Sequence, residues 1–132
     1  MNNNISLKPV GSYSQVLINT NTPLIFNNPL FGNLNVYMDN YNNPWFMGKE
    51  VAEKLGYKDT RKAIWTHVLE ENKMTIRVVS EFQGESPWNP LGGNPNMVFI
   101  NEYGLYDLVR SSKMRYAKDF KYWTDMITVQ LR

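Results

Sequence analysis

Residues 44–57 read PWFMGKEVAEKLGY, and they carry the end of a strand, a helix and the residue that stops it. The apolar run 45–47 is typical of a buried strand, and Gly48 can begin the helix predicted over 49–55. Gly56 supplies the left-handed residue that commonly ends a helix. The apolar side of this helix consists of Val51, Ala52 and Leu55.

The residues before this stretch predict its partner strand. Apolar and polar side chains alternate over 34–38, with Leu34, Val36 and Met38 on one side. A polar loop then precedes the run 45–47. We therefore expect a β-hairpin that joins these two segments.

Residues 1–30 are rich in asparagine and are interrupted by prolines, among them Pro23 and Pro29, a composition that favours turns. This segment could contain short strands at 16–18 and 24–26, or it could form an arm that packs weakly against the domain. We interpret residues 1–30 as an Asn-rich N-terminal extension and residues 31–132 as one domain.

A second helix is predicted over about 61–69, with either Asp59 or Thr60 as its N-cap. Strands are expected at 74–79 and 97–100, on either side of a long loop over 80–96.

Two further helices complete the chain. Asn101 caps the first, which continues to about Arg110, and the last covers about 114–130. At about 100° per residue one arc of the last helix is apolar and is predicted to be core. The residues assigned to this core are Tyr116, Phe120, Trp123 and Ile127. Together these elements predict an α+β domain, in which a small antiparallel sheet is packed with about four helices, including a helix-turn-helix-like pair.

The composition excludes several classes of enzyme. The chain has 132 residues, enough for one domain, with no cysteine and a single histidine, His67. Thiolate sites and multi-histidine metal sites are therefore impossible, and an ion pair accounts for Glu71 near His67 better than a metal site does. No serine has a base arranged around it, and Gly92-Gly93 lacks the lysine of a phosphate-binding loop. We expect no enzymatic activity, no cofactor and no metal.

No apolar run approaches the ~18 residues that a membrane span requires. The N-terminus also lacks the apolar core of a signal peptide. We expect no membrane partner and an intracellular protein.

Positive charge is concentrated near the last helix. The formal net charge is only +2, but five bases lie between Arg110 and Lys121 against one acid, Asp119. A solvated helix face and a phosphate-binding surface both fit this cluster. The bases lie outside the apolar arc, so they face water or a partner.

The helix pair over 49–69 offers a second basic segment. In a helix-turn-helix the N-terminal side chains of the second helix contact bases and phosphates. Here those side chains would belong to Thr60, Arg61, Lys62 and Trp65. A pair of core helices explains the same residues equally well.

Three blocks of sequence follow one another in the chain: PWFMGKEVAEKLGY with RKAI and HV, then LGG to INEYGLY, then AKDFKYW. Together they resemble the N-terminal domain of viral Bro proteins and phage antirepressors. The resemblance covers about residues 31–132 and implies a DNA-binding α+β domain of large DNA viruses, phages and prophages. It further implies a role in transcription, replication or antirepression, in the host cytoplasm or nucleus if viral and in the bacterial cytoplasm if phage.

Non-catalytic DNA binding is the leading hypothesis, with double- or single-stranded DNA as the partner. The residues predicted to contact DNA are Lys58, Thr60, Arg61, Lys62, Lys113, Arg115, Lys118 and Lys121. The alternative is a protein-interaction module that captures a repressor or host factor through Trp88 in the loop over 80–96.

Overall fold

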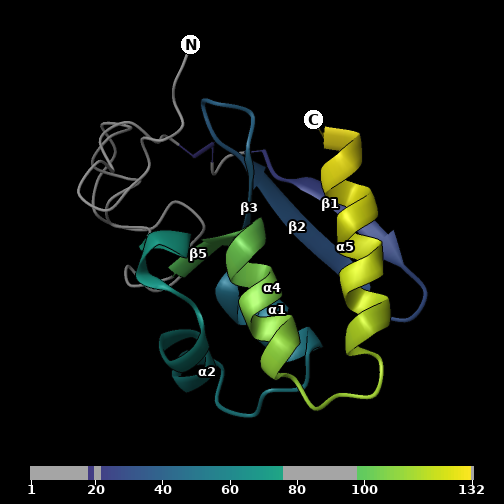
Figure 1. Ribbon diagram of the computed structural model, residues 1–132. Helices are drawn as coiled ribbons and strands as arrows, with labels where there is room; N and C mark the ends of the chain where they lie inside the picture. The colour runs from purple at the N-terminus through teal and green to yellow at the C-terminus, as the bar shows by residue number, and fades with distance from the viewer. Residues whose placement is uncertain (1–17, 20–21, 76–97, 132) are drawn as a thin grey trace.

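The computed structural model describes residues 18–19, 22–75 and 98–131. Within these residues the chain forms one five-stranded sheet in the order β1-β2-β3-β5-β4, and all neighbouring strands are antiparallel (Figure 1). The strands are β1 (Leu24–Asn28), β2 (Gly32–Met38), β3 (Pro44–Met47), β4 (Lys73–Thr75) and β5 (Val98–Asn101).

The predicted hairpin is confirmed as β2 and β3, in which Val36 pairs with Phe46. Both side chains are fully buried, because the alternation along β2 places one set of side chains against the helices. The β3–β5 pairing places Phe46 opposite Ile100, and it brings the C-terminal helices onto the hairpin.

The sheet extends into the segment that the sequence assigned to the extension. β1 pairs with β2 over five residues, from Leu24 opposite Val36 to Asn28 opposite Gly32. Ile18, which forms an isolated bridge with Asp39, is fully buried. Ordered structure therefore begins before residue 30, while the boundary between extension and domain stays a prediction.

The helices are α1 (Gly48–Lys54), α2 (Thr60–His67), α4 (Glu102–Ser111) and α5 (Ala117–Leu131), with a 3-10 turn η3 (Glu70–Asn72) after α2. The predicted α+β class is thus confirmed. α1 and α4 both contact β3 and β5, and they cover the middle of the sheet (Figure 1). α5 packs near β1, where the Phe31 ring stacks on the Trp123 ring with centroids 5.9 Å apart.

Local sequence signals account for several helix ends. Asp59 is the N-cap of α2, since its side chain accepts a hydrogen bond of 3.0 Å from the backbone N–H of Lys62. Asn101 caps α4 in the same way, through the backbone N–H of Gly104. Gly56 has φ +85°, the left-handed conformation predicted for the end of α1.

Two predictions about helices are corrected. α2 ends at His67 instead of continuing to Leu69, because Val68 has extended backbone angles. Tyr116 was assigned to the core, and this is wrong, since the residue is 41% exposed. It precedes the first residue of α5, so the helical phase that places Phe120 and Ile127 in the core does not extend to it.

Part of the predicted loop region lies outside the described residues. The strand expected at 74–79 is described only as far as Thr75. The loop over 80–96 lies wholly outside the description, and so does Trp88.

Candidate nucleic-acid interface

The two basic segments of the sequence are joined in space by their connecting loops. Ser112, between α4 and α5, donates a hydrogen bond of 2.8 Å from its Oγ to the backbone carbonyl of Leu55 at the end of α1. Tyr57 donates from its hydroxyl to the carbonyl of Leu108 at 2.7 Å. The α1–α2 and α4–α5 connections are therefore neighbours, although about 50 residues separate them in the chain.

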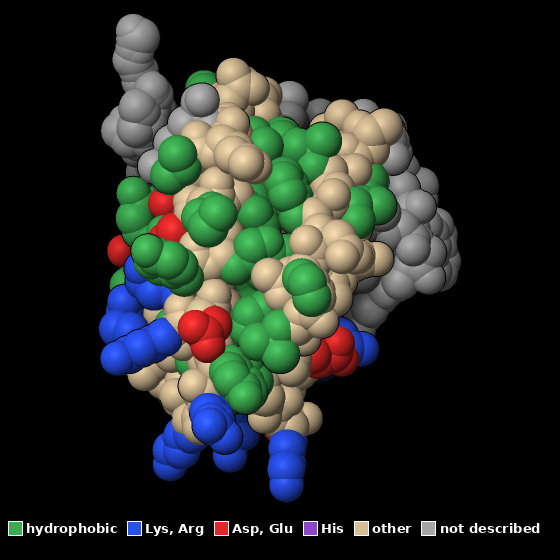
Figure 2. All heavy atoms as spheres, turned by 90° about the vertical axis from the view of Figure 1, so that its right-hand side faces the viewer, with side chains coloured by type: hydrophobic (Ala, Val, Ile, Leu, Met, Phe, Trp, Pro, Cys, Tyr) green, Lys and Arg blue, Asp and Glu red, His purple; other side chains and the backbone are tan. Residues whose placement is uncertain are grey.

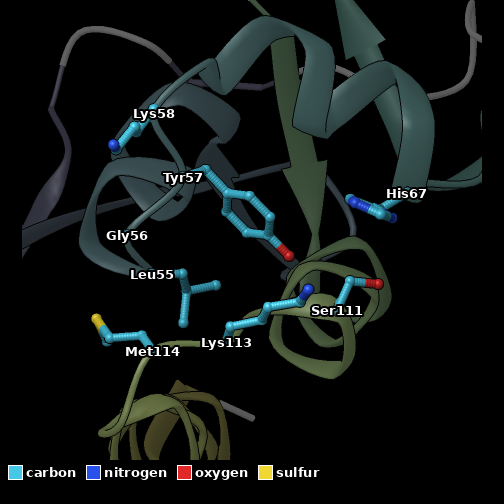
Figure 3. A pocket seen from close by; sticks show the side chains of 8 residues that line it. All are labelled: Leu55, Gly56, Tyr57, Lys58, His67, Ser111, Lys113 and Met114. Carbon is cyan, nitrogen blue, oxygen red and sulfur yellow. The ribbon is translucent and has the colours of Figure 1, made fainter.

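A hollow of about 620 Å³ lies between these connections (Figure 3). Lys58 from the first segment and Lys113 from the second both line it. The structure thus brings together the two segments that the sequence singled out separately.

Positive side chains gather at this end of the molecule. Both connections lie at the lower end of Figure 1, and Figure 2 shows Lys and Arg side chains projecting from the lower end after rotation about the vertical axis. The upper part of the face in Figure 2 shows mainly apolar and uncharged polar side chains.

Six of the predicted DNA contacts are exposed cations, and none of them forms an ion pair within the described residues. Arg115 only approaches the Tyr116 ring, with its guanidinium carbon 5.5 Å from the ring centroid. Unpaired exposed cations are available to neutralise phosphates at little cost. We call these six residues the basic end: Lys58, Arg61, Lys62, Lys113, Arg115 and Lys118.

Lys121 differs from these six residues. Its ammonium lies 2.8 Å from a carboxylate oxygen of Asp125 and 4.9 Å from the centroid of the Tyr106 ring. Partial burial alone would raise the pKa of Asp125, but hydrogen bonds from Lys121 and Tyr106 together lower it below its ordinary value. The i,i+4 spacing of Lys121 and Asp125 was the sequence signal for this pair.

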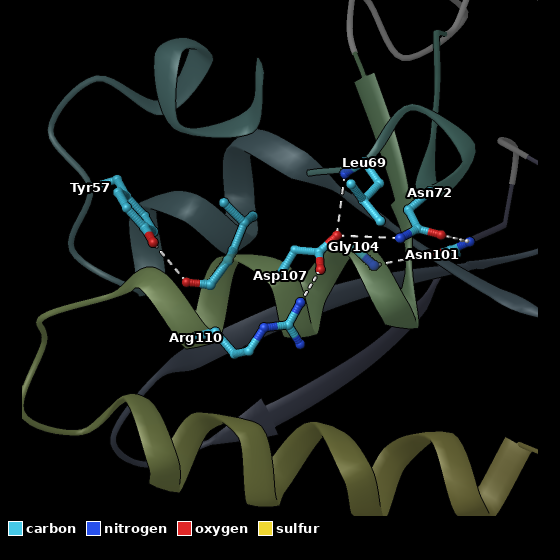
Figure 4. Close-up of polar contacts among 8 residues, drawn as sticks. Tyr57, Leu69, Asn72, Asn101, Gly104, Asp107 and Arg110 are labelled. Carbon is cyan, nitrogen blue, oxygen red and sulfur yellow. Dashed lines mark hydrogen bonds and ion pairs between the residues drawn. The ribbon is translucent and has the colours of Figure 1, made fainter. Parts of the chain in front are cut away.

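α4 holds α2 in place at both ends (Figure 4). Before α2, Tyr57 is fixed to Leu108. After α2, the buried carboxylate of Asp107 accepts hydrogen bonds of 3.3 Å from the backbone N–H of Leu69 and from the amide of Asn72. Asp107 also pairs with Arg110. Hydrogen bonds to α4 therefore hold the chain on both sides of α2.

The N-terminal turn of α2 carries Thr60, which is half-buried, and the exposed Arg61 and Lys62. Trp65 is 48% exposed, but the ammonium of Lys73 lies 4.3 Å from the centroid of its ring. The Trp65 ring is thus engaged within the protein, which leaves the charged side chains as the stronger candidates for DNA contact.

Other kinds of site find no support in the described part of the chain. No group of three His, Asp or Glu side chains there could hold a metal ion. No helix among the same residues has the length and apolar character needed to cross a membrane.

The amino-acid sequence matches a known protein family over most of its length. The model described as "BRO family, N-terminal domain" matches residues 33–127, which is most of the described fold. The chain belongs to the BRO family. No solved structure matches it.

Relatives of this Bro-N domain occur in large DNA viruses and in a bacterium. A putative Bro-N domain-containing protein of Invertebrate iridescent virus 6 is 37% identical over 86 residues, covering 59% of this chain and 21% of the relative. An uncharacterized Bro-N domain-containing protein of Acanthamoeba polyphaga mimivirus is 37% identical over 82 residues, covering 61% of this chain and 33% of the relative.

An uncharacterized protein of Haemophilus influenzae is 32% identical over 79 residues, covering 60% of this chain and 34% of that protein. The match to these three relatives therefore spans between about a fifth and a third of their length. The two viral relatives are named for a Bro-N domain.

Proposed function

We propose that this Bro-N domain binds DNA through the basic end and catalyses no reaction. The supporting observation is that Lys58 and Lys113, which come from two distant segments, line one hollow. The other four cations of the basic end lie within five residues of one of these two lysines in the chain. A polyanion with regularly spaced phosphates is the partner that such a surface fits.

The two segments have different roles in this proposal. Lys113, Arg115 and Lys118 neutralise phosphates and so fix the position of the domain on DNA. At the start of α2, Arg61 reaches a base edge, because arginine can donate two parallel hydrogen bonds to guanine. Thr60 and Lys62 contact the adjacent backbone.

In this proposal the domain acts only by binding DNA, without altering it chemically. It serves as the DNA-binding part of a viral or phage regulator of the antirepressor type, and it works in the compartment that holds its DNA.

A salt titration tests the proposal directly. Binding of random duplex and single-stranded DNA to the full chain is measured by fluorescence anisotropy over a range of salt concentrations. If the five cations of the basic end other than Arg61 contact phosphates, log K falls with log salt with a slope of about −4.5 on duplex DNA. If neither duplex nor single-stranded DNA binds at low salt, the proposal is refuted.

The double variant Arg61→Ala/Lys62→Ala tests the role of α2. We expect a loss of affinity of about tenfold to a hundredfold and a slope that is shallower by about one, because Lys62 is the phosphate contact of this pair. Lys49→Ala is the matched control, because Lys49 is exposed and lies near the start of α1, away from Gly56. Equal affinities for the double variant and the control would remove α2 from the interface.

A further inference from the structure

The hollow between the two connections has the volume of a ligand site. Its 620 Å³ falls within the range of about 300–1,000 Å³ that is usual for small-molecule pockets. It lies within the basic end, with Lys58 on the α1–α2 side and Lys113 on the α4–α5 side.

The lining combines two kinds of chemistry. The cationic part consists of Lys58 and Lys113, neither of which pairs with an acid among the described residues, and no lining residue is acidic. Lysine is a common phosphate ligand because its ammonium carries a compact charge and three donors. This part of the hollow favours a phosphate group.

The other part of the lining is aromatic and apolar. The rings of Tyr57 and His67 form one wall, with centroids 5.8 Å apart, and Leu55 and Met114 supply apolar surface. In Figure 3 the Tyr57 ring lies between the two lysine side chains. A simple inorganic anion would leave this wall unused, whereas an aromatic base stacks on it.

The Tyr57 ring is held in a fixed orientation. Its hydroxyl donates to the carbonyl of Leu108, and burial raises the pKa of this hydroxyl although a hydrogen bond with Ser111 partly offsets the effect. The ring face is therefore presented without a further ordering cost on binding.

We propose that this hollow binds a single nucleotide, with the base against Tyr57 and Met114 and the phosphate at the ammonium of Lys113. The nucleotide is either one unpaired unit of a DNA strand or a free nucleoside phosphate. For the first source the inference rests on the proposed function, since the strand then lies along the basic end.

Titration of the full chain with thymidine 5′-monophosphate, followed by backbone amide NMR, tests the site. We expect shifts at Tyr57, Ser111 and Lys113, and tighter binding than with thymidine or inorganic phosphate alone. Lys113→Ala should weaken nucleotide binding about tenfold, because one charge-assisted contact is lost. Lys121→Ala is the control, since Lys121 is ion-paired and does not line the hollow.

A second variant distinguishes the contribution of the hollow to binding from the contribution of the surrounding positive charge. Met114→Trp fills the apolar part without removing a cation, and circular dichroism checks that the variant is folded. We expect it to lose nucleotide binding and to keep its affinity for a fully paired duplex. Unchanged nucleotide binding in this variant would overturn the inference.

A duplex with one unpaired thymine distinguishes the two sources. Tighter binding than to the paired duplex, about tenfold and lost in Met114→Trp, assigns the site to a nucleotide of the DNA strand. Nucleotide binding with equal affinities for both duplexes assigns it to a free nucleotide. Nucleotide binding without any DNA binding supports the free nucleotide and refutes the proposed function. Duplex binding without nucleotide shifts and without preference for the unpaired thymine overturns the inference and leaves the proposed function standing.

Discussion

The hydroxyl of Ser112 donates a hydrogen bond of 2.8 Å to the backbone carbonyl of Leu55, and this contact spans 57 residues of the chain. The same hydroxyl oxygen accepts a hydrogen bond of 3.1 Å from the backbone N–H of Met114. One side chain thus ties the end of α1 to the loop before α5. Together with the hydrogen bond from Tyr57 to Leu108, this contact joins the two segments that carry the basic end.

Ser112→Ala should therefore weaken both the fold and the interface. Loss of two hydrogen bonds lowers the free energy of unfolding by about 2 kcal/mol. DNA affinity should fall as well, although no charge is removed. Urea denaturation and fluorescence anisotropy measure the two effects. Thr66→Ala removes an exposed hydroxyl that has no hydrogen bond within the described residues, and it should change neither quantity by much.

Lys118 and Lys121 should contribute differently to DNA binding, although both lie on α5. Lys118→Ala should reduce the salt slope by about 0.9, because this side chain has no acidic partner in the described structure. Lys121→Ala should reduce it less, since Asp125 already neutralises Lys121. Equal reductions in the two variants would contradict this prediction, and salt titrations of both variants decide it.

Asp107 should matter for stability more than any exposed acid. Asp107→Ala leaves the backbone N–H of Leu69 and the amide of Asn72 without their acceptor, and Asn72 is only 8% exposed. We expect the free energy of unfolding to fall by about 3 kcal/mol, measured by urea denaturation. Glu53→Ala, at an exposed position of α1, should cost less than about 0.5 kcal/mol. Similar losses in the two variants would show that the Asp107 contacts do not stabilise the fold.

At neutral pH the free energy of unfolding should be lower with Glu50 than with an uncharged residue of the same shape at this position. Burial raises the pKa of Glu50, and hydrogen bonds from Asn35 and the nearby charge of Lys54 offset this only in part. Because the folded state then binds the proton more tightly than the unfolded state, the free energy of unfolding falls as pH rises from the ordinary carboxyl pKa to the raised pKa.

Glu50→Gln should accordingly be more stable than the natural chain at about pH 7, and the gain should disappear near pH 3.5, where the carboxyl is protonated in both states. Urea denaturation at the two pH values measures this difference. Glu53→Gln, on the exposed side of the same helix, serves as the control. A Glu50→Gln variant that is less stable at neutral pH would contradict the assigned direction.

The sequence predicted the elements that local interactions specify. The hairpin of β2 and β3 followed from alternation, and the N-cap of α4 followed from Asn101 at its start. Phe120 and Ile127 were found by helical phase, which is a property of consecutive residues. Tyr116 was missed because the start of α5 was placed too early, so a correct periodicity was applied outside the helix.

The candidate site was only partly predictable. The cations of the basic end were visible as two clusters, and the pairing of Lys121 with Asp125 was accessible from spacing. The participation of Tyr57 and Met114 had no sequence signal, because each contributes to the hollow only through contact with a distant segment. β1 was also uncertain, since a short strand of uncharged residues is ordered by pairing with β2.

The amino-acid sequence by itself determined where helices and strands form, which faces are apolar and which segments carry charge, because propensity, capping and periodicity act between residues that are close in the chain. The tertiary structure alone decided that Lys58 and Lys113 border one hollow and that the Tyr57 hydroxyl contacts the carbonyl of Leu108. Such relationships arise when sheet pairing and helix packing bring distant segments together, and no local pattern encodes that distance.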